Sequence, residues 1–136
     1  MSRFEQKVVI KETHLDVFGH MNNATYLQIF EEARWDLIVS RGFNLEQIKK
    51  SKTGPVILEC NIKFLKELQA REEITVTVEQ LLGEGEPHPK IFKLKQQMLS
   101  SKGEIACEAI FTYGLFDLEN RRLIAPTPEW KYAVSL

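Results

Sequence analysis

The chain has 136 residues, of which 43% are hydrophobic and 27% charged, a composition typical of one globular domain. Lysine and arginine number 18 against 19 for aspartate and glutamate, and the net charge of -1 excludes bulk attraction to nucleic acid or anionic lipid. Apolar runs such as 37–39 are far shorter than the ~18 residues of a membrane span, and the N-terminus lacks a signal-peptide core. We therefore expect a cytoplasmic protein without membrane or nucleic-acid partners.

Hydrophobic spacing divides the first part of the chain into strand, loop and helix. Residues 3–11 alternate between apolar and polar side chains, which predicts a strand. A polar loop over 14–23 follows. From Ala24 to Arg41 the apolar residues recur every three or four positions, which predicts one long helix with Asn22 or Asn23 as its N-cap and Gly42 at its C-terminal end. A short helix over 45–50 is expected before the turn at 52–55.

Period-two alternation then recurs in four runs, 56–64, 74–79, 92–98 and 105–113. The connections at 83–89 and 100–103 are short, and short connections imply antiparallel neighbours. The order of one strand, a helix and four strands predicts an α+β fold over 1–136, with a five-stranded antiparallel sheet packed on one helix. The segment 125–130 is expected to be a surface tail, in which Trp130 contributes to an interface or covers the sheet edge.

One helix covers only one face of such a sheet. Lys93, Lys95 and Gln97 suggest that part of the other face is solvated. Unpaired edge strands can add a second copy of the chain, which hides their free N–H and C=O groups. A homodimer is therefore expected, with a homotetramer as the alternative.

Cysteine and histidine spacing gives little sign of a metal site. Cys60 and Cys107 both fall in alternating apolar runs, so we expect two buried free thiols. The three histidines lack the paired spacing of metal ligands. No metal and no bound cofactor is expected.

The loop before the long helix carries the residue types that acyl transfer needs. Asp16 supplies a carboxylate, and Gly19 allows the backbone to approach a ligand closely. Free N–H groups at a helix start favour developing negative charge. A carboxylate there can attack a carbonyl, or activate water, while an N–H holds the carbonyl oxygen. The alternative is that Asp16 is only a cap or turn residue.

The stretch DVFGHMNNATY at 16–26, which runs into EEAR at 31–34, resembles the signature of the hotdog-fold acyl thioesterases. More narrowly, it resembles the 4-hydroxybenzoyl-CoA thioesterase-like branch, which includes many bacterial acyl-CoA thioesterases. The resemblance implies a hotdog fold, with the sheet wrapped around the central helix, and hydrolysis of an acyl thioester, most simply acyl-CoA. The alternatives are an acyl-carrier-protein thioesterase, a hotdog dehydratase or hydratase, and a non-catalytic acyl-CoA-binding module.

The resemblance also implies roles for individual residues. Asp16 matches the catalytic aspartate, as nucleophile or as general base for water. Asn23 matches the position whose backbone N–H polarises the thioester carbonyl. His20 matches the histidine of a plant thioesterase pattern, D-x-N-x-H, but Phe18 stands where that pattern has asparagine. This departure favours a mechanism that uses the aspartate and the helix start.

Other residues of the signature are weaker candidates. Glu59, expected on a strand, and Glu31, expected on the helix, are reserve catalytic carboxylates, and both can instead be surface charges, with Glu31 paired to Arg34. Contacts with substrate are implied for Gly19, Met21, Asn22 and Tyr26. Asn22 is equally interpretable as an N-cap, Tyr26 as a core residue, and His20 as a partner of the loop backbone.

Overall fold

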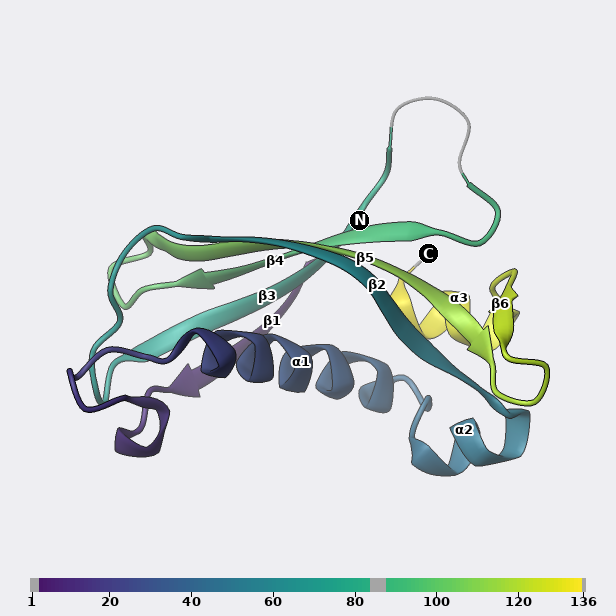
Figure 1. Ribbon diagram of the computed structural model, residues 1–136, viewed down its shortest axis with the longest axis horizontal. Coiled ribbons are helices and arrows are strands. Elements are labelled where there is room, and N and C mark those ends of the chain that lie inside the picture. Colours follow the sequence, from purple (N-terminus) through teal and green to yellow (C-terminus); the bar gives the residue numbers. More distant parts are fainter. Residues whose placement is uncertain (1–2, 84–87, 136) are drawn as a thin grey trace.

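A long helix packed on an antiparallel sheet dominates the computed structural model, which describes residues 3–83 and 88–135 (Figure 1). The helix is α1 (Asn23–Ser40). Over these residues the sheet has six strands: β1 (Phe4–Val9), β2 (Thr53–Phe64), β3 (Glu73–Leu81), β4 (Phe92–Leu99), β5 (Ile105–Asp117) and β6 (Arg122–Ile124). Their order is β1-β3-β4-β5-β2, with β6 paired to β5, and every pair is antiparallel. The expected α+β class is confirmed.

The core lies between α1 and the sheet face that curves around it. One side of α1 is buried along its length, through Tyr26, Ile29, Phe30, Ala33, Leu37 and Ile38. The facing side chains are the inward members of the alternating strands, among them Ile74, Val76, Val78, Leu94, Met98, Ala109, Phe111 and Tyr113. Burial of apolar surface on both partners fixes the position of α1, and with it the position of the loop that precedes α1.

Over the described residues, three shorter helices complete the fold. The 3₁₀-helix η1 (Glu12–His14) follows β1, and α2 (Leu45–Ser51) closely matches the short helix expected at 45–50. The third, α3 (Pro128–Val134), replaces the expected surface tail. In the described ranges no helix is long and apolar enough to cross a membrane.

The expectation of a tail was wrong because the segment begins a capped helix. The Thr127 side chain accepts a hydrogen bond from the Trp130 N–H at 3.2 Å, and Pro128 occupies a first-turn position, where the missing N–H costs nothing. Trp130 is 2% exposed, and its ring packs edge-on against Phe43 at 4.9 Å and Tyr113 at 6.4 Å. The C-terminal helix is therefore part of the core.

The three-residue strand β6 was not expected because it is too short to show alternation. It turns back along the end of β5, where Leu115 pairs with Ile124. Gly114 makes this close approach feasible, because a Cβ there would lie 2.8 Å from both the Leu123 side chain and the Lys90 carbonyl oxygen.

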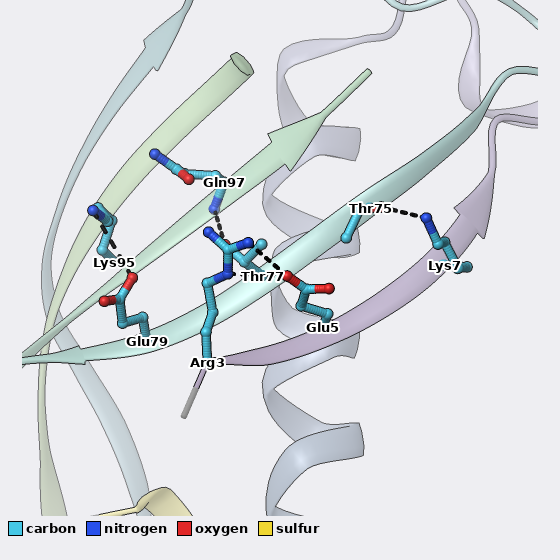
Figure 2. Close-up of polar contacts among 8 residues, drawn as sticks. All are labelled: Arg3, Glu5, Lys7, Thr75, Thr77, Glu79, Lys95 and Gln97. Carbon is cyan, nitrogen blue, oxygen red and sulfur yellow. Dashed lines mark hydrogen bonds and ion pairs between the residues drawn. The ribbon is translucent and has the colours of Figure 1, made fainter. Parts of the chain in front are cut away.

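The sheet face turned away from α1 is polar across β1, β3 and β4 (Figure 2). Its side-chain contacts are Arg3 with Glu5 at 2.6 Å, Lys7 with Thr75 at 2.8 Å and Lys95 with Glu79 at 3.9 Å. Lys93 is exposed, as expected of a solvated face, but Gln97 is only 8% exposed. Gln97 lies beside Thr77, whose hydroxyl accepts its backbone N–H at 2.9 Å.

The two cysteines differ, contrary to expectation. Cys107, in the middle of the sheet, is fully buried, and this burial raises its pKa to about 12. Cys60 is exposed, because it lies on β2, the strand at one end of the sheet. Alternation alone does not distinguish an edge strand from a central one.

Replacing Trp130 with alanine should destabilise the fold by about 3–5 kcal/mol, since a buried aromatic ring is lost and its cavity remains. The matched control is Tyr132→Ala on the same helix, where the side chain is 64% exposed, and we expect a loss under about 1 kcal/mol. Urea denaturation measures both. Equal losses for the two variants would show that α3 does not dock through Trp130.

Candidate functional site

The loop between η1 and α1 is closed on itself. Leu15 and Met21 form an antiparallel bridge, and the Asn22 N–H donates to the His14 carbonyl at 3.4 Å. Gly19 has a φ of +79°, a left-handed conformation that other residues adopt only with strain. The bridge therefore places residues 16–20 directly beside the start of α1.

Asp16 is held by this loop through its own backbone and one carboxylate oxygen. Its N–H donates to the His20 carbonyl at 2.8 Å, and its carbonyl accepts from Gly19 at 3.1 Å. Oδ1 accepts from the backbone N–H groups of Phe18 at 2.9 Å and His20 at 3.3 Å. Among the described residues Oδ2 accepts no hydrogen bond. The side chain is exposed, so one oxygen orients the carboxylate and the other is available for chemistry.

The first turn of α1 leaves one N–H unused. Asn22 is the N-cap: its side chain accepts from Ala24 at 2.8 Å, and its carbonyl accepts from Thr25 at 2.9 Å. In the part of the chain that the structure describes, no group accepts the N–H of Asn23, the first helical residue. A free N–H at the positive end of an eighteen-residue helix is suited to hold an anionic oxygen.

The other signature residues surround this pair in different ways. His20 does not bond the loop backbone through its ring; Nε2 lies 2.9 Å from a Glu67 oxygen, and both side chains are largely exposed. Met21 and Tyr26 are buried at 5% and 6% exposure. Tyr26 packs edge-on against Phe64 at 4.9 Å, and burial raises the pKa of its hydroxyl. These two side chains support the loop from the core side.

The two reserve carboxylates lie elsewhere. Glu31 is eight positions after Asn23, which puts it about 12 Å further along the helix. Glu59 lies on β2, where it pairs with Thr112 of β5. Its neighbour Cys60 faces α1, so strand alternation turns Glu59 to the sheet face that points away from α1. Both are exposed. Among the described residues, no hydrogen bond or ion pair joins either carboxylate to Asp16, and none joins His20 to Glu31.

Two hollows follow one another along α1. The outer hollow, about 280 Å³, lies between α1 and β2 and is lined by Leu27, Gln28, Glu31, Arg34, Ile57, Cys60 and Phe111. The inner cavity, about 100 Å³, lies further along the helix, and β2, β3, β4, β5 and α3 also contribute to its lining. The two share Glu31, Arg34 and Ile57. Together they make a largely apolar path whose lining begins at Leu27, about one turn into α1.

A series of hydrogen bonds that starts at Arg34 crosses this apolar interior. The Arg34 Nη1 donates to the Gln96 Oε1 at 2.9 Å, and the Gln96 Nε2 donates to the Phe30 carbonyl at 3.0 Å. The guanidinium carbon lies 4.3 Å above the centre of the Phe111 ring. Burial lowers the pKa of Arg34, and the charge of Glu31 opposes that shift. The expected pairing of Arg34 with Glu31 in an ion pair is not present.

Sequence reasoning missed Arg34 and Gln96 as members of the site, although both gave a signal. Arg34 shares its helical stripe with the apolar Leu27 and Ile38, and Gln96 stands in the inward alternation of β4 between Leu94 and Met98. A charged or amide side chain at an inward position must be hydrogen-bonded inside the protein.

The inner cavity also has buried donors without partners. The Gln80 Nε2 and the Trp130 Nε1 are both fully buried, and neither has a hydrogen-bond acceptor among the residues that the structure describes. The Tyr113 hydroxyl donates to the Gln80 Oε1 at 2.5 Å, and burial raises the pKa of Tyr113, which keeps the hydroxyl protonated. Gln80, Tyr113 and Trp130 all line the inner cavity.

Over residues 3–83 and 88–135, the acidic, histidine and cysteine side chains form no cluster of three or more that could hold a metal ion.

Residues 10–134 match the Thioesterase-like superfamily, and the chain belongs to this family. It is 25% identical over 123 residues to the long-chain acyl-CoA thioesterase FadM of Escherichia coli K12, covering 89% of each chain. It is 31% identical over 77 residues to the chloroplastic acyl-acyl carrier protein thioesterase ATL3 of Arabidopsis thaliana, covering 56% of this chain and 40% of that one.

Among solved structures, SAV2348 of Staphylococcus aureus in complex with CoA superposes with a TM-score of 0.87, at 19% identity, over 98% of this chain and 82% of that one. The hotdog fold expected from the signature at 16–26 is confirmed, and so is the enzyme class, a thioester hydrolase.

Proposed function

We propose that this thioesterase hydrolyses acyl-CoA in the cytoplasm, at a site formed by Asp16 and the backbone N–H of Asn23. The observation that supports the proposal is that the Leu15–Met21 bridge joins the loop that bears Asp16 to the start of α1. Within the described residues, Asp16 Oδ2 accepts no hydrogen bond and no group accepts the Asn23 N–H. Similarity to FadM and to a protein solved with CoA supports CoA as the carrier.

The reaction needs one proton acceptor and one oxyanion donor. The thioester carbonyl oxygen accepts the Asn23 N–H, which stabilises the negative charge that develops as the carbonyl is attacked. Asp16 takes a proton from the attacking water, or attacks first to form a mixed anhydride that water then hydrolyses. The C–S bond breaks, and the products are the free acid and the thiol of the carrier.

The acyl chain would lie along α1. The outer hollow lies next to the helix start, and its lining of Leu27, Ile57 and Phe111 is apolar. The inner cavity continues it towards α3. Desolvation of the acyl chain in this path would provide most of its binding energy, at roughly 0.8 kcal/mol for each methylene group.

A second copy would complete the site. Strand β2 ends the sheet, with β5 as its one described neighbour. It is twelve residues long, and the backbone groups that point to its free side have no described partner. Exposed apolar side chains gather along this strand and the neighbouring helix face: Leu27, Ile57, Leu58, Phe64 and Leu65. Pairing of β2 with β2 of a partner would cover them and would wall the outer hollow, so we propose a homodimer, with a homotetramer as its further assembly.

Other functions receive less support. The plant carrier-protein thioesterase matches only part of the chain, so acyl-carrier protein is the second candidate carrier. A dehydratase would need a histidine paired with a carboxylate across the substrate, and His20 instead pairs with the exposed Glu67, well away from Glu31.

Wild-type protein should release thiol from acyl-CoAs, and Asp16→Asn should lower kcat/KM by about 100-fold or more, because asparagine cannot accept the proton. Asparagine keeps an oxygen for the Phe18 and His20 N–H groups, so the loop should remain folded. Thiol release is measured on matched panels of acyl-CoAs and acyl-carrier proteins.

The control for this substitution is Asp117→Asn. At the turn after β5, Oδ1 of Asp117 likewise accepts hydrogen bonds from two backbone N–H groups. The Asp117→Asn substitution should leave turnover unchanged. Undiminished activity in Asp16→Asn would remove Asp16 from the mechanism. Tight acyl-CoA binding without any thiol release would instead identify a non-catalytic binding module.

The Asn23 N–H can be deleted without changing the helix. Proline is tolerated at the first helical position, and Asn22, with φ -63° and ψ 144°, already has the conformation that a following proline requires. Asn23→Pro should therefore fold normally but lose about 100- to 1,000-fold in kcat. Asn23→Ala, which keeps the N–H, should stay close to wild type. A loss of equal size in both variants would indicate that the side chain acts, rather than the backbone.

Leu58→Lys should convert the dimer to monomers, because a charge on a free strand edge opposes strand pairing. Leu58 is 45% exposed at the centre of β2, beside the register shift between Ile57 and Glu59. The matched control is Val9→Lys on the other edge strand, β1, where Val9 is 37% exposed. Light scattering coupled to size exclusion measures the mass of each variant. A monomeric wild type, or dissociation of Val9→Lys alone, would contradict assembly through β2.

A further inference from the structure

The inner cavity is apolar in most of its lining, but two of its lining side chains carry hydrogen-bond donors without partners among the described residues. The Gln80 amide is 94% buried, since its residue is 6% exposed, and its Nε2 has no acceptor. The Trp130 indole is 2% exposed, and its Nε1 has no acceptor either. Both residues line the same cavity. Buried donors without acceptors are rare in native proteins, and two at one cavity indicate that a ligand oxygen belongs there.

No described neighbour accepts these hydrogens. The Tyr113 hydroxyl already donates to the Gln80 Oε1, which fixes the amide with its NH₂ group unpaired. Arg34, at the boundary with the outer hollow, adds a guanidinium with no described carboxylate within ion-pair distance. The set is therefore rich in donors, and the matching ligand group is one that accepts hydrogen bonds without needing to donate any.

We infer that the acyl substrate carries a carbonyl oxygen, as in a ketone, near the end of its chain remote from the thioester, and that Gln80 and Trp130 recognise this oxygen. The inference rests on the proposed function, because it places the acyl chain along α1. We choose a neutral ketone rather than a carboxylate, because Glu31 also lines the cavity and its negative charge would offset the attraction of Arg34 for an anion.

The position of the cavity sets the position of the oxygen. Arg34 lies eleven positions after Asn23, which is about 16 Å along the helix axis. An extended chain with carbon–carbon bonds of ~1.5 Å advances about 1.3 Å for each carbon, so roughly a dozen carbons span this distance. The oxygen is expected on one of the last carbons of a chain of about this length.

The cavity has room for such a group. Its volume of about 100 Å³ is somewhat smaller than the roughly 150 Å³ that accommodates a benzene molecule in a protein interior. It is also large enough for ordered water, which would satisfy the same donors when no substrate is bound. A substrate oxygen replaces the hydrogen bonds of that water, whereas an unsubstituted chain displaces the water and leaves the donors unpaired. The cost of leaving the donors unpaired is why the site should prefer an acyl chain with the oxygen over an unsubstituted chain.

The test compares dodecanoyl-CoA with a series of oxododecanoyl-CoAs, in which one ketone is moved from the middle of the chain to the penultimate carbon. We expect kcat/KM to be about tenfold or more higher for the isomer with the ketone near the end than for dodecanoyl-CoA. The kcat/KM for a chain with a terminal carboxylate should be no higher than for the chain with a ketone on the penultimate carbon. In parallel, titration calorimetry measures binding of the free oxo acid and of dodecanoic acid, which reports on the cavity without any hydrolysis.

Two variants tie the preference to the cavity. The double variant Gln80→Leu with Tyr113→Phe removes the free amide and its partner together, and Trp130→Phe removes only the indole N–H. Each should bring the ratio of the two kcat/KM values towards one. The matched control is Gln97→Leu, a glutamine buried to a similar degree on the opposite face of the sheet, which should keep the wild-type ratio. Thermal melting establishes that each variant is folded.

The outcomes separate the inference from the proposed function. Hydrolysis of dodecanoyl-CoA without any gain from a ketone overturns the inference and leaves the proposed function intact. A gain that persists in both cavity variants overturns the assignment to Gln80 and Trp130. Absence of hydrolysis with tighter binding of the oxo acid overturns the proposed function and supports the cavity. Absence of both overturns both.

Discussion

The packing of α1 against the inner face of the sheet determines everything else in this fold. The helix is eighteen residues long and buries one side along its whole length, so its two ends are held at opposite ends of the core. At its start, the bridge between Leu15 and Met21 returns the chain and holds the loop that carries Asp16 next to the first turn of α1. At the other end, α3 closes the core with Trp130. The candidate site and the wall of the inner cavity are thus both positioned by one helix.

The interior of this fold is not wholly apolar, and its polar groups differ in how well they are satisfied. Arg34, Gln96 and the Phe30 carbonyl form a connected series in which each group has a partner. Gln80 and Trp130 each retain a buried N–H without one, which costs about 1–3 kcal/mol for each group. An apolar residue at either position would avoid that cost. Such local departures from good packing are expected where a protein binds something.

Much of this arrangement could be predicted from sequence, because periodicity reports burial directly. The long helix, the four later strands and the loop at 14–23 were all expected close to where they lie, since each has a clear period and clear turn residues. The signature at 16–26 located the candidate site. The roles of Asp16 and Asn23 stay predictions, but their placement side by side follows from the loop and helix start that the sequence indicates.

The elements that sequence reasoning missed share a physical cause. β6 is too short to have a period, and α3 was obscured by prolines that also occur in loops. Whether Cys60 is buried depends on β2 lying at the sheet edge, which is a property of strand order and not of the strand itself. The donors of the inner cavity come from three separate strands or helices, β3, β5 and α3, so no single stretch of sequence shows that they meet.

Because α3 contributes to the cavity wall, the residues proposed for bond cleavage and the residues that shape the cavity lie in different parts of the sequence. The residues proposed for bond cleavage lie within the first 23 positions, whereas Trp130 and Val134, at the end of the acyl path, belong to the final helix. Changes at those late positions alter the depth and polarity of the path while the loop that holds Asp16 keeps its hydrogen bonds. Substrate range in such a protein can therefore diverge through its C-terminal residues, with the reaction itself conserved.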